Sequence, residues 1–332
     1  MEKINVQGHI LEIQRMSTED GPGLRTTLFM KGCLLHCPWC HNPESISSRT
    51  QIQWFSQKCL GCLSCIPICL NRALQVIENN EIAINQHRCT GCGKCVDMCP
   101  ATALQLFGRY QNAEEVANEL LKDLAYFRGA EDGGITISGG EAALQPDFVR
   151  EVFSLVKAAD VSTALDTCGV CSWKDLEKAA EFADIILFDL KICDQEEHSK
   201  VVGGDFPAIL ENLRRVAAMN KRIWLRTPII PGYTDSKKNI TGLARKAAEI
   251  LHEFGENAVE RWELCAFNDL CADTYHRLGM PWALKGKGLM HREQMESLID
   301  TIISTGFPAN RVLWTGMVQK ERGDTNHDAV VR

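Results

Sequence analysis

The 332-residue sequence lacks several features that would assign it to common classes of protein. It contains no apolar run near the ~20 residues that span a bilayer, and its first residues carry neither the basic nor the apolar region of a signal peptide. Acidic residues outnumber basic ones by 43 to 36, without a basic stripe. We therefore expect a cytoplasmic protein that binds neither nucleic acid nor a membrane surface.

The distribution of cysteines also argues against a disulfide scaffold. The sequence has 16 cysteines, many for a cytosolic protein, whose thiols stay reduced. Eleven of them fall in three tight clusters between Cys33 and Cys99. This clustering indicates metal binding. The other five are scattered and receive no assigned role: Cys168, Cys171, Cys193, Cys265 and Cys271.

The first cluster is the triplet Cys33, Cys37 and Cys40, with the spacing C-x3-C-x2-C and no fourth cysteine nearby. A [4Fe–4S] cluster takes four thiolates. Three thiolates would leave one iron with an open coordination position, as in catalytic metal centres. The alternative is a zinc site that His36 or His41 completes.

The second and third clusters repeat one pattern, C-x2-C-x2-C-x3-C, thirty residues apart. This is the spacing of bacterial ferredoxins, in which the fourth cysteine of each run binds the other cluster. The alternative is a pair of zinc knuckles. The ferredoxin pattern predicts one cluster held by Cys59, Cys62, Cys65 and Cys99, and another held by Cys89, Cys92, Cys95 and Cys69.

Apolar strand patterns alternate with helical ones from about residue 110 onward, which predicts parallel strands joined by right-handed crossovers. With a strand from Thr26, we count six such units. The predicted fold is α/β, an incomplete (β/α)6 TIM-type barrel with an inserted ferredoxin-like domain. A doubly wound open sheet fits the pattern nearly as well. The expected domains are the barrel (1–48 and 106–315), the insert (49–105) and a polar tail (316–332).

The residues around the triplet carry a resemblance to a known family. The run from Asp20 to Glu44 reads DGPGLRTTLFMKGCLLHCPWCHNPE, and a Ser-Gly-Gly-Glu turn follows a strand at Ser138. This pattern resembles the radical S-adenosylmethionine (SAM) enzymes and, within them, the activating enzymes of glycyl radical enzymes that carry a ferredoxin-like insert.

The resemblance implies an anaerobic oxidoreductase with three [4Fe–4S] clusters and SAM as cofactors. Such an enzyme reductively cleaves SAM to a 5′-deoxyadenosyl radical, which takes a hydrogen atom from a backbone glycine of a partner glycyl radical enzyme. The implied electron donor is a flavodoxin or ferredoxin, and the implied state is a monomer. Two alternatives stay open: a radical SAM enzyme for a small molecule, and a non-enzymatic electron carrier. The identity of the partner enzyme also stays open.

The same resemblance implies roles for individual residues. Asp20 and Arg25 resemble the region that receives the partner's glycine loop, although both could equally pin their own Gly/Pro turn. A small monovalent cation is implied at Asp166, Thr167 and Asp189. Contacts to SAM are implied for Trp39, Cys40, His41, Gly139, Gly140, Glu141, Asp189, Leu190, Lys191, Arg226 and His276.

Overall fold

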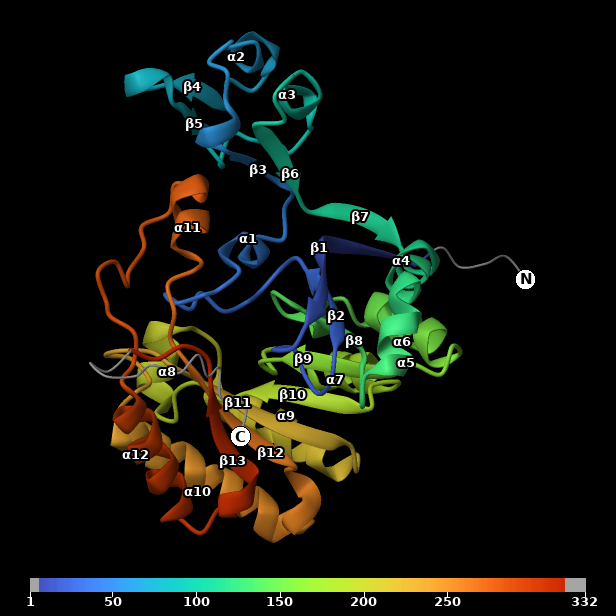
Figure 1. The fold of residues 1–332 in the computed structure, drawn as a ribbon, viewed down its shortest axis with the longest axis vertical. Helices are drawn as coiled ribbons and strands as arrows, with labels where there is room; N and C mark the ends of the chain where they lie inside the picture. Colours follow the sequence, from blue (N-terminus) through green and yellow to red (C-terminus); the bar gives the residue numbers. More distant parts are fainter. Residues whose placement is uncertain (1–5, 320–332) are drawn as a thin grey trace.

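A nine-stranded mixed sheet in the order β13-β12-β11-β10-β9-β8-β2-β1-β7 forms the centre of the computed structural model, which describes residues 6–319 (Figure 1). The seven strands from β2 to β13 run parallel, and β1 and β7 pair antiparallel at one edge. The strands are β1 (Gln7–Ser17), β2 (Arg25–Met30), β7 (Arg109–Asn112), β8 (Gly134–Gly139), β9 (Ser162–Thr167), β10 (Ile185–Asp189), β11 (Arg222–Ile229), β12 (Arg261–Ala266) and β13 (Val312–Thr315).

The helices that follow these strands lie side by side on the outer face of the curved sheet. Their contacts run in the order α4, α6, α7, α9, α10, α12, the order of the strands they accompany (Figure 1). A doubly wound sheet would carry helices on both faces, so the expected incomplete barrel is confirmed. The helices are α4 (Ala113–Leu120), α5 (Leu124–Gly129), α6 (Pro146–Lys157), α7 (Trp173–Ala180), α8 (Gln195–Val201), α9 (Phe206–Ala218), α10 (Lys237–Phe254), α11 (Ala272–Leu278) and α12 (Arg292–Ile303).

The core between sheet and helices comes from apolar residues at helical spacing. Helix α6 buries Phe148, Val149, Val152 and Phe153 against the strands. Strand β1 approaches this helix so closely that a Cβ on Gly8 would lie 2.3 Å from the ring of Phe148. Only glycine fits there without displacing the ring.

One expected helix is interrupted. The apolar spacing over residues 113–127 predicts a single helix, but a 3-10 turn at Leu121–Asp123 separates α4 from α5. The buried carboxylate of Asp123 accepts a hydrogen bond from Thr26 Oγ1 at 2.7 Å and also pairs with Arg15. These contacts with β1 and β2 hold residues 121–123 in a 3-10 turn and so interrupt the α-helix.

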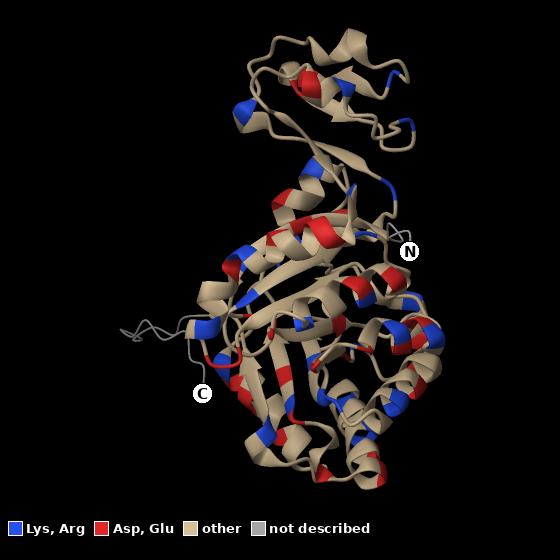
Figure 2. Ribbon diagram, turned by 90° about the vertical axis from the view of Figure 1, so that its right-hand side faces the viewer, with Lys and Arg blue, Asp and Glu red and all other residues tan. Residues whose placement is uncertain are grey.

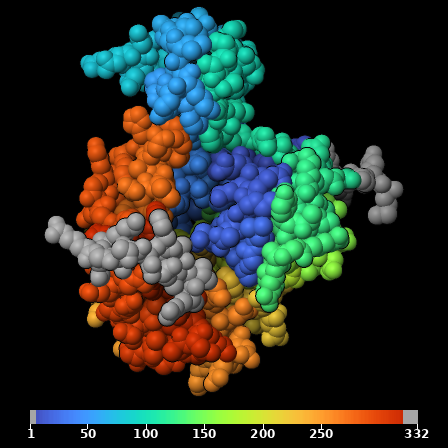
Figure 3. Space-filling view, in the orientation of Figure 1, coloured from blue at the N-terminus to red at the C-terminus, as the bar shows by residue number. Residues whose placement is uncertain are grey.

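A small lobe interrupts the chain between β2 and β7 (Figures 1 and 3). Its two short sheets enclose a core of its own that contains Ile52, Leu74 and Leu104. The lobe comprises β3 (Gln51–Trp54), α2 (Cys65–Ile68), β4 (Leu74–Val76), β5 (Ile82–Ile84), α3 (Lys94–Asp97) and β6 (Leu104–Phe107), and α1 (Pro43–Ile46) precedes it. β3 pairs with β6, and β4 with β5.

Helix α11 lies between this lobe and the barrel, as the orange segment shows (Figure 3). Arg277 on this helix donates to Gln53 Oε1 at 2.8 Å, and its guanidinium lies 4.8 Å from the ring centroid of Phe55. The lobe is therefore held by side chains as well as by its two connections to the barrel.

Acidic and basic residues are interspersed over the outer helices (Figure 2). Among residues 6–319, none of the helices is both long and apolar enough to cross a bilayer. The predicted polar tail lies outside the described residues from position 320 onward.

Candidate active site

The triplet of cysteines lies in the loop that follows β2, at the edge of the sheet where all the parallel strands end. The backbone N–H of Cys33 donates to the carbonyl of Ile46 at 3.0 Å. At the other end of the loop, the hydroxyl of Tyr275 donates to the carbonyl of Cys40 at 3.1 Å. These bonds fix both ends of a loop whose three thiols, Cys33, Cys37 and Cys40, are all free.

The Gly-Gly turn at the end of β8 packs directly against this loop. The N–H of Gly140 donates to Met30 O at 3.0 Å, and that of Glu141 donates to Gly32 O at 2.8 Å. A Cβ on Gly139 would lie 2.2 Å from Met30 N, and one on Gly140 would lie 2.2 Å from Gly32 O. The two glycines therefore permit contact between two backbone segments, besides any approach to a ligand.

Glu141 is buried, and its carboxylate accepts four hydrogen bonds. Oε1 accepts from Thr167 Oγ1 at 2.8 Å and from Ala143 N at 3.0 Å. Oε2 accepts from Cys168 N at 2.9 Å and from Cys168 Sγ at 3.0 Å. Four donors match the roughly four acceptor sites of a carboxylate. The side chain thus joins the Gly-Gly turn to the end of β9.

Lys191 brings a buried ammonium to the cysteine loop. Its Nζ lies 2.5 Å from Asp189 Oδ2. Burial disfavours the charged form, but Asp189 and Cys37 outweigh burial and raise the pKa of Lys191 well above its ordinary value. Burial raises the pKa of Cys37 to about 11 and that of Cys40 further. Binding of iron would release protons from these thiols, and three soft sulfur donors beside an ammonium suit an anionic iron–sulfur cluster.

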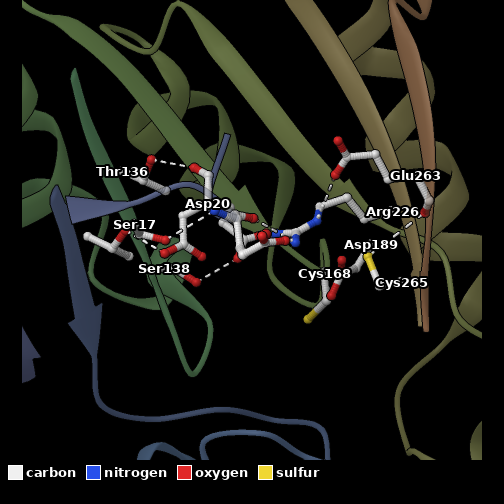
Figure 4. A network of polar contacts seen from close by, with 12 residues as sticks. Ser17, Asp20, Thr136, Ser138, Cys168, Asp189, Arg226, Glu263 and Cys265 are labelled. Carbon is white, nitrogen blue, oxygen red and sulfur yellow. Dashed lines mark hydrogen bonds and ion pairs between the residues drawn. The ribbon is translucent and has the colours of Figure 1, made fainter. Parts of the chain in front are cut away.

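Arg226 on β11 crosses the interior of the barrel (Figure 4). Its guanidinium donates to Glu19 O at 3.0 Å and lies 3.9 Å from Asp166 Oδ2 and 3.6 Å from Glu263 Oε2. Its carbonyl accepts from Leu190 N at 2.8 Å. Among the described residues, the buried Nε of Arg226 has no hydrogen-bond partner. This Nε is the atom that lies 3.6 Å from Glu263 Oε2, so an ion pair offsets part of the cost of an unpaired buried donor.

The residues implied for a cation lie at the ends of β9 and β10, but only part of the set converges. Asp166 accepts from Ser138 Oγ at 2.6 Å, and burial, reinforced by Asp189, raises the pKa of Asp166 to about 7. The side chain of Thr167 instead donates to Glu141. Within the described part of the chain, no three His, Cys, Asp or Glu side chains surround a single ion position.

Asp20 and Arg25 lie at the opposite end of β2 from the cysteine loop. Asp20 accepts at its carbonyl from Thr136 Oγ1 at 2.7 Å and at its carboxylate from Thr27 Oγ1 at 2.8 Å (Figure 4). Arg25 is fully buried and donates to Ile135 O at 2.6 Å. These contacts hold the Arg25 side chain against β8 and the segment before it.

The segment after β12 differs most from the expectation. His276 is exposed on α11, whereas the adjacent Tyr275 is buried and reaches the cysteine loop. Asn268 was not among the predicted residues, yet its Oδ1 lies 2.8 Å from His41 Nε2. Trp39 is buried, with its ring centroid 5.3 Å from that of Tyr233. The only sequence signal for Asn268 is its position just beyond a parallel strand.

The lobe brings its eight cysteines together as two quartets around two hollows. The first hollow is lined by Trp54, at one end of β3. The second hollow is lined by Ile52 and lies nearer the barrel. Cys59, Cys62, Cys65 and Cys99 line the first, of about 380 Å³ with open solvent included. Cys69, Cys89, Cys92 and Cys95 line the second, of about 350 Å³. Each quartet contains the fourth cysteine of the other run, as ferredoxin ligation requires.

Comparisons with known proteins agree with this geometry. Residues 58–103 match the family model described as 4Fe-4S dicluster domain, and residues 86–244 match the model described as Radical SAM superfamily. The benzylsuccinate synthase activating enzyme of Thauera aromatica is 38% identical over 240 residues, which cover 71% of this chain and 72% of that one. This chain belongs to the glycyl radical enzyme activating enzymes of the radical SAM superfamily.

Other members of the family match over a greater length. The indoleacetate decarboxylase activating enzyme of Tractidigestivibacter scatoligenes is 34% identical over 308 residues, covering 90% of this chain and 95% of that one. Among solved structures, a radical SAM methyltransferase from Sphaerobacter thermophilus covers 92% of this chain and 77% of its own, with a TM-score of 0.50 and 14% identity. That likeness supports the fold alone. Family membership implies a [4Fe–4S] cluster and SAM for this activating enzyme.

Proposed function

We propose that this chain removes a hydrogen atom from a backbone glycine of a partner glycyl radical enzyme, with Cys33, Cys37 and Cys40 holding the cluster that binds SAM. When bound, cluster and SAM together supply the chemistry, because one electron cleaves the sulfonium to methionine and a 5′-deoxyadenosyl radical. The observation that carries this proposal is the three-thiol loop at the mouth of the barrel, beside the buried ammonium of Lys191.

Residues of the chain would hold the two ends of the cofactor. Arg226 and Lys191 are the cations that would meet its carboxylate, since Arg226 lies in register with Asp189, the ion-pair partner of Lys191, and both cations therefore come to the same end of the sheet. The backbone of Gly139 and Gly140 lies against the cysteine loop, where carbonyl oxygens could accept from an ammonium. Trp39 and His41 flank the last cysteine and would border the remainder of the cofactor.

The lobe would relay electrons through two further [4Fe–4S] clusters, from a flavodoxin or ferredoxin to the triplet. The quartet of Cys69 lies nearer the barrel, since the loop at Gly91 packs so closely on Thr50 that a Cβ on Gly91 would lie 2.7 Å from Thr50 O. The quartet of Cys59 lies at the far end of β3 and would receive the electron from the external donor. Free thiols throughout suit a reducing cytoplasm.

Two smaller elements of the proposal concern charge and assembly. A monovalent cation between Asp166 and Asp189 would offset the excess of carboxylates in the barrel interior, where Asp20 and Glu263 also lie (Figure 4). The enzyme would act as a monomer towards its partner, because one chain supplies the triplet, the cations and both quartets.

The decisive experiment combines the anaerobically reconstituted protein, SAM, a reductant and a glycyl radical enzyme chosen from the proteins encoded near its gene. A glycine-centred doublet in the electron paramagnetic resonance (EPR) spectrum is the expected result. SAM cleavage without any glycine signal would point to a small-molecule substrate instead.

A pair of variants tests the site. Cys37→Ala should abolish SAM cleavage and keep most of the iron, because both quartets remain. Cys193→Ala is the matched control, since this thiol packs beneath Gly242 away from the triplet, and it should cleave SAM normally. Cleavage by Cys37→Ala would refute the assignment, and absence of cleavage by the wild-type protein would favour an electron carrier.

A further inference from the structure

The segment that leads from α1 into β3 is held by a buried histidine of the barrel. This connecting segment, residues 44–51, carries the chain from the cysteine loop to the lobe. His9 on β1 places Nδ1 3.0 Å from Ser48 O and Nε2 3.2 Å from Thr50 Oγ1. Because a carbonyl oxygen only accepts, Nδ1 donates to Ser48. Neither the sequence pattern nor the proposed function assigns a role to His9 or to the connecting segment.

A buried ammonium holds the two ends of the same segment. Lys31 directly follows β2, and its Nζ donates to Glu44 O at 2.5 Å and to Gln51 Oε1 at 3.1 Å. In the connection that leads back from the lobe, a Cβ on Gly108 would lie 2.2 Å from Lys31 Cδ. Burial of a charge costs free energy unless polar groups surround it. A flexible linker needs no such anchor, so the course of the connecting segment is specifically fixed.

At one end, the connecting segment contacts the cysteine loop. The N–H of Gly32 donates to Ser45 O at 2.7 Å, and that of Cys33 donates to Ile46 O at 3.0 Å. A Cβ on Gly32 would lie 3.5 Å from Ser48 Cβ, within van der Waals contact. Because Cys33 belongs to the triplet, these bonds join the connecting segment directly to a residue that would hold the cluster.

At the other end, the connecting segment contacts the quartet nearer the barrel. Gly91 lies between Cys89 and Cys92, and a Cβ on it would lie 2.7 Å from Thr50 O. The N–H of Gly91 donates to the sulfur of Cys89 at 3.5 Å. A continuous path of covalent bonds, hydrogen bonds and one packing contact therefore runs from Cys89 to Cys33.

We propose that residues 44–51 carry the electron from the lobe to the triplet, and that His9 is the positioning residue that holds this route in contact at both ends. Electrons tunnel faster through bonds and packed atoms than across gaps. In this step a reduced cluster of the lobe loses one electron, and the triplet's cluster, which has passed its own electron to SAM, gains it; no proton or group moves. This inference rests on the proposed function, because it needs the clusters.

Helix α11 offers a second connection between the lobe and the triplet. Tyr275 donates to Cys40 O, and Arg277 contacts Gln53 and Phe55. Neither Gln53 nor Phe55 lines either of the two hollows. We therefore expect α11 to hold the lobe without carrying the electron, which makes Arg277→Ala the matched control.

The experiment counts the electrons that reach SAM. The full-length, reconstituted protein is reduced, freed of reductant and mixed with SAM, and the 5′-deoxyadenosine formed is followed with time. The wild-type protein should form one equivalent from the triplet's own electron, and then a second phase that the two lobe clusters supply. In His9→Leu the first equivalent should form normally, and the second phase should be largely lost. His9→Asn keeps an amide donor for Ser48 O and should recover most of the second phase.

Trypsin gives a readout that does not depend on SAM. Arg49 is exposed and lies between the two residues that His9 holds. Cleavage after Arg49 follows the open population of the connecting segment, which one lost hydrogen bond raises by up to about tenfold. Cleavage should rise accordingly in His9→Leu, whereas Arg277→Ala should keep both the resistance at Arg49 and the second phase. If His9→Leu does not fold, Thr50→Val removes the hydroxyl alone and should change both readouts in the same direction.

The results separate this inference from the proposed function. If the wild-type protein forms no 5′-deoxyadenosine, the proposed function fails. If it forms a single equivalent only, or if His9→Leu keeps the wild-type second phase, the inference about the connecting segment is wrong. Unchanged cleavage after Arg49 in His9→Leu would contradict the positioning role. Equal losses of the second phase in His9→Leu and Arg277→Ala would also overturn the inference, because any loosening of the lobe would then be sufficient.

Discussion

Substitution of Glu141 by glutamine is the sharpest test of how the active site is built. The resemblance to radical SAM activating enzymes implies a contact between Glu141 and SAM. In the structure, its two oxygens are already occupied by donors from Thr167, Ala143 and Cys168. We therefore expect Glu141→Gln to destabilise the folded active site of the SAM-free protein.

The magnitude follows from the donors around the side chain. The amide of glutamine has one oxygen and one NH2 group, and the NH2 must face either Cys168 N or Ala143 N. Neither backbone N–H can reverse, so one buried donor loses its acceptor, at a cost of ~1–3 kcal/mol. The remaining bonds also lose the assistance of a negative charge. Together these give about 3 kcal/mol, a factor of roughly a hundred in the local opening equilibrium.

The assay is amide hydrogen exchange of the SAM-free protein, because a protein with several clusters does not unfold in one step. Protection at Ala143 and Cys168 should fall by about a hundredfold in Glu141→Gln. The matched control is Glu181→Gln, which breaks the ion pair between Glu181 and Arg150 at 2.5 Å. The side chain of Glu181 is 45% exposed. An exposed pair contributes below ~1 kcal/mol, so protection at the active site should not change. Unchanged exchange in Glu141→Gln, combined with weaker SAM binding, would refute the structural role and restore the direct contact.

Three further predictions concern other parts of the chain. Burial, followed by the charge of Lys191, lowers the pKa of His198 to about 4. The stability that neutral His198 contributes is complete above its unfolded pKa of about 6.5 and is lost as the pH falls towards 4. His198→Gln should therefore flatten the dependence of melting temperature on pH, and an unchanged slope would contradict this prediction. Arg277→Ala should increase proteolysis of the lobe near Phe55, while SAM cleavage driven by a small-molecule reductant continues. If SAM cleavage were also lost, α11 would support the triplet as well as the lobe. Trp262→Ala should destabilise the barrel by ~3–5 kcal/mol, since the side chain is fully buried, and a melting temperature equal to that of the wild-type protein would contradict this.

The parts of the molecule that could be predicted from the sequence depend on residues close together in the chain. Six parallel strands follow from apolar runs separated by helical spacing, and all six are present. The cysteine pattern predicts which sulfurs share a hollow because the ferredoxin repeat is short and has fixed spacing. The strand β13 is missing from the prediction because its four residues, Val312–Thr315, carry too little pattern to distinguish them from a loop.

The parts that could not be predicted depend on side-chain direction and on contacts across the fold. Tyr275 and His276 are adjacent, but successive residues of a helix point about a quarter-turn or more apart, so only one of them reaches the cysteine loop. Asn268 meets His41 across 227 positions of sequence, which no local spacing encodes. The break between α4 and α5 likewise needs a partner for Asp123 on a distant strand.

Glu141 illustrates a difference between the ligands of the cluster and the charges around it. The ligands follow from local sequence, whereas the surrounding charges depend on the tertiary structure. The three cysteines occupy eight residues of one loop, so spacing alone is enough to place them. The charge around them is assembled from the ends of β8, β9 and β10, which only the barrel brings together. Because the buried carboxylate of Glu141 ties β8 to β9, Glu141→Gln should disturb this assembly, whereas the three cysteines should keep their spacing within their own loop.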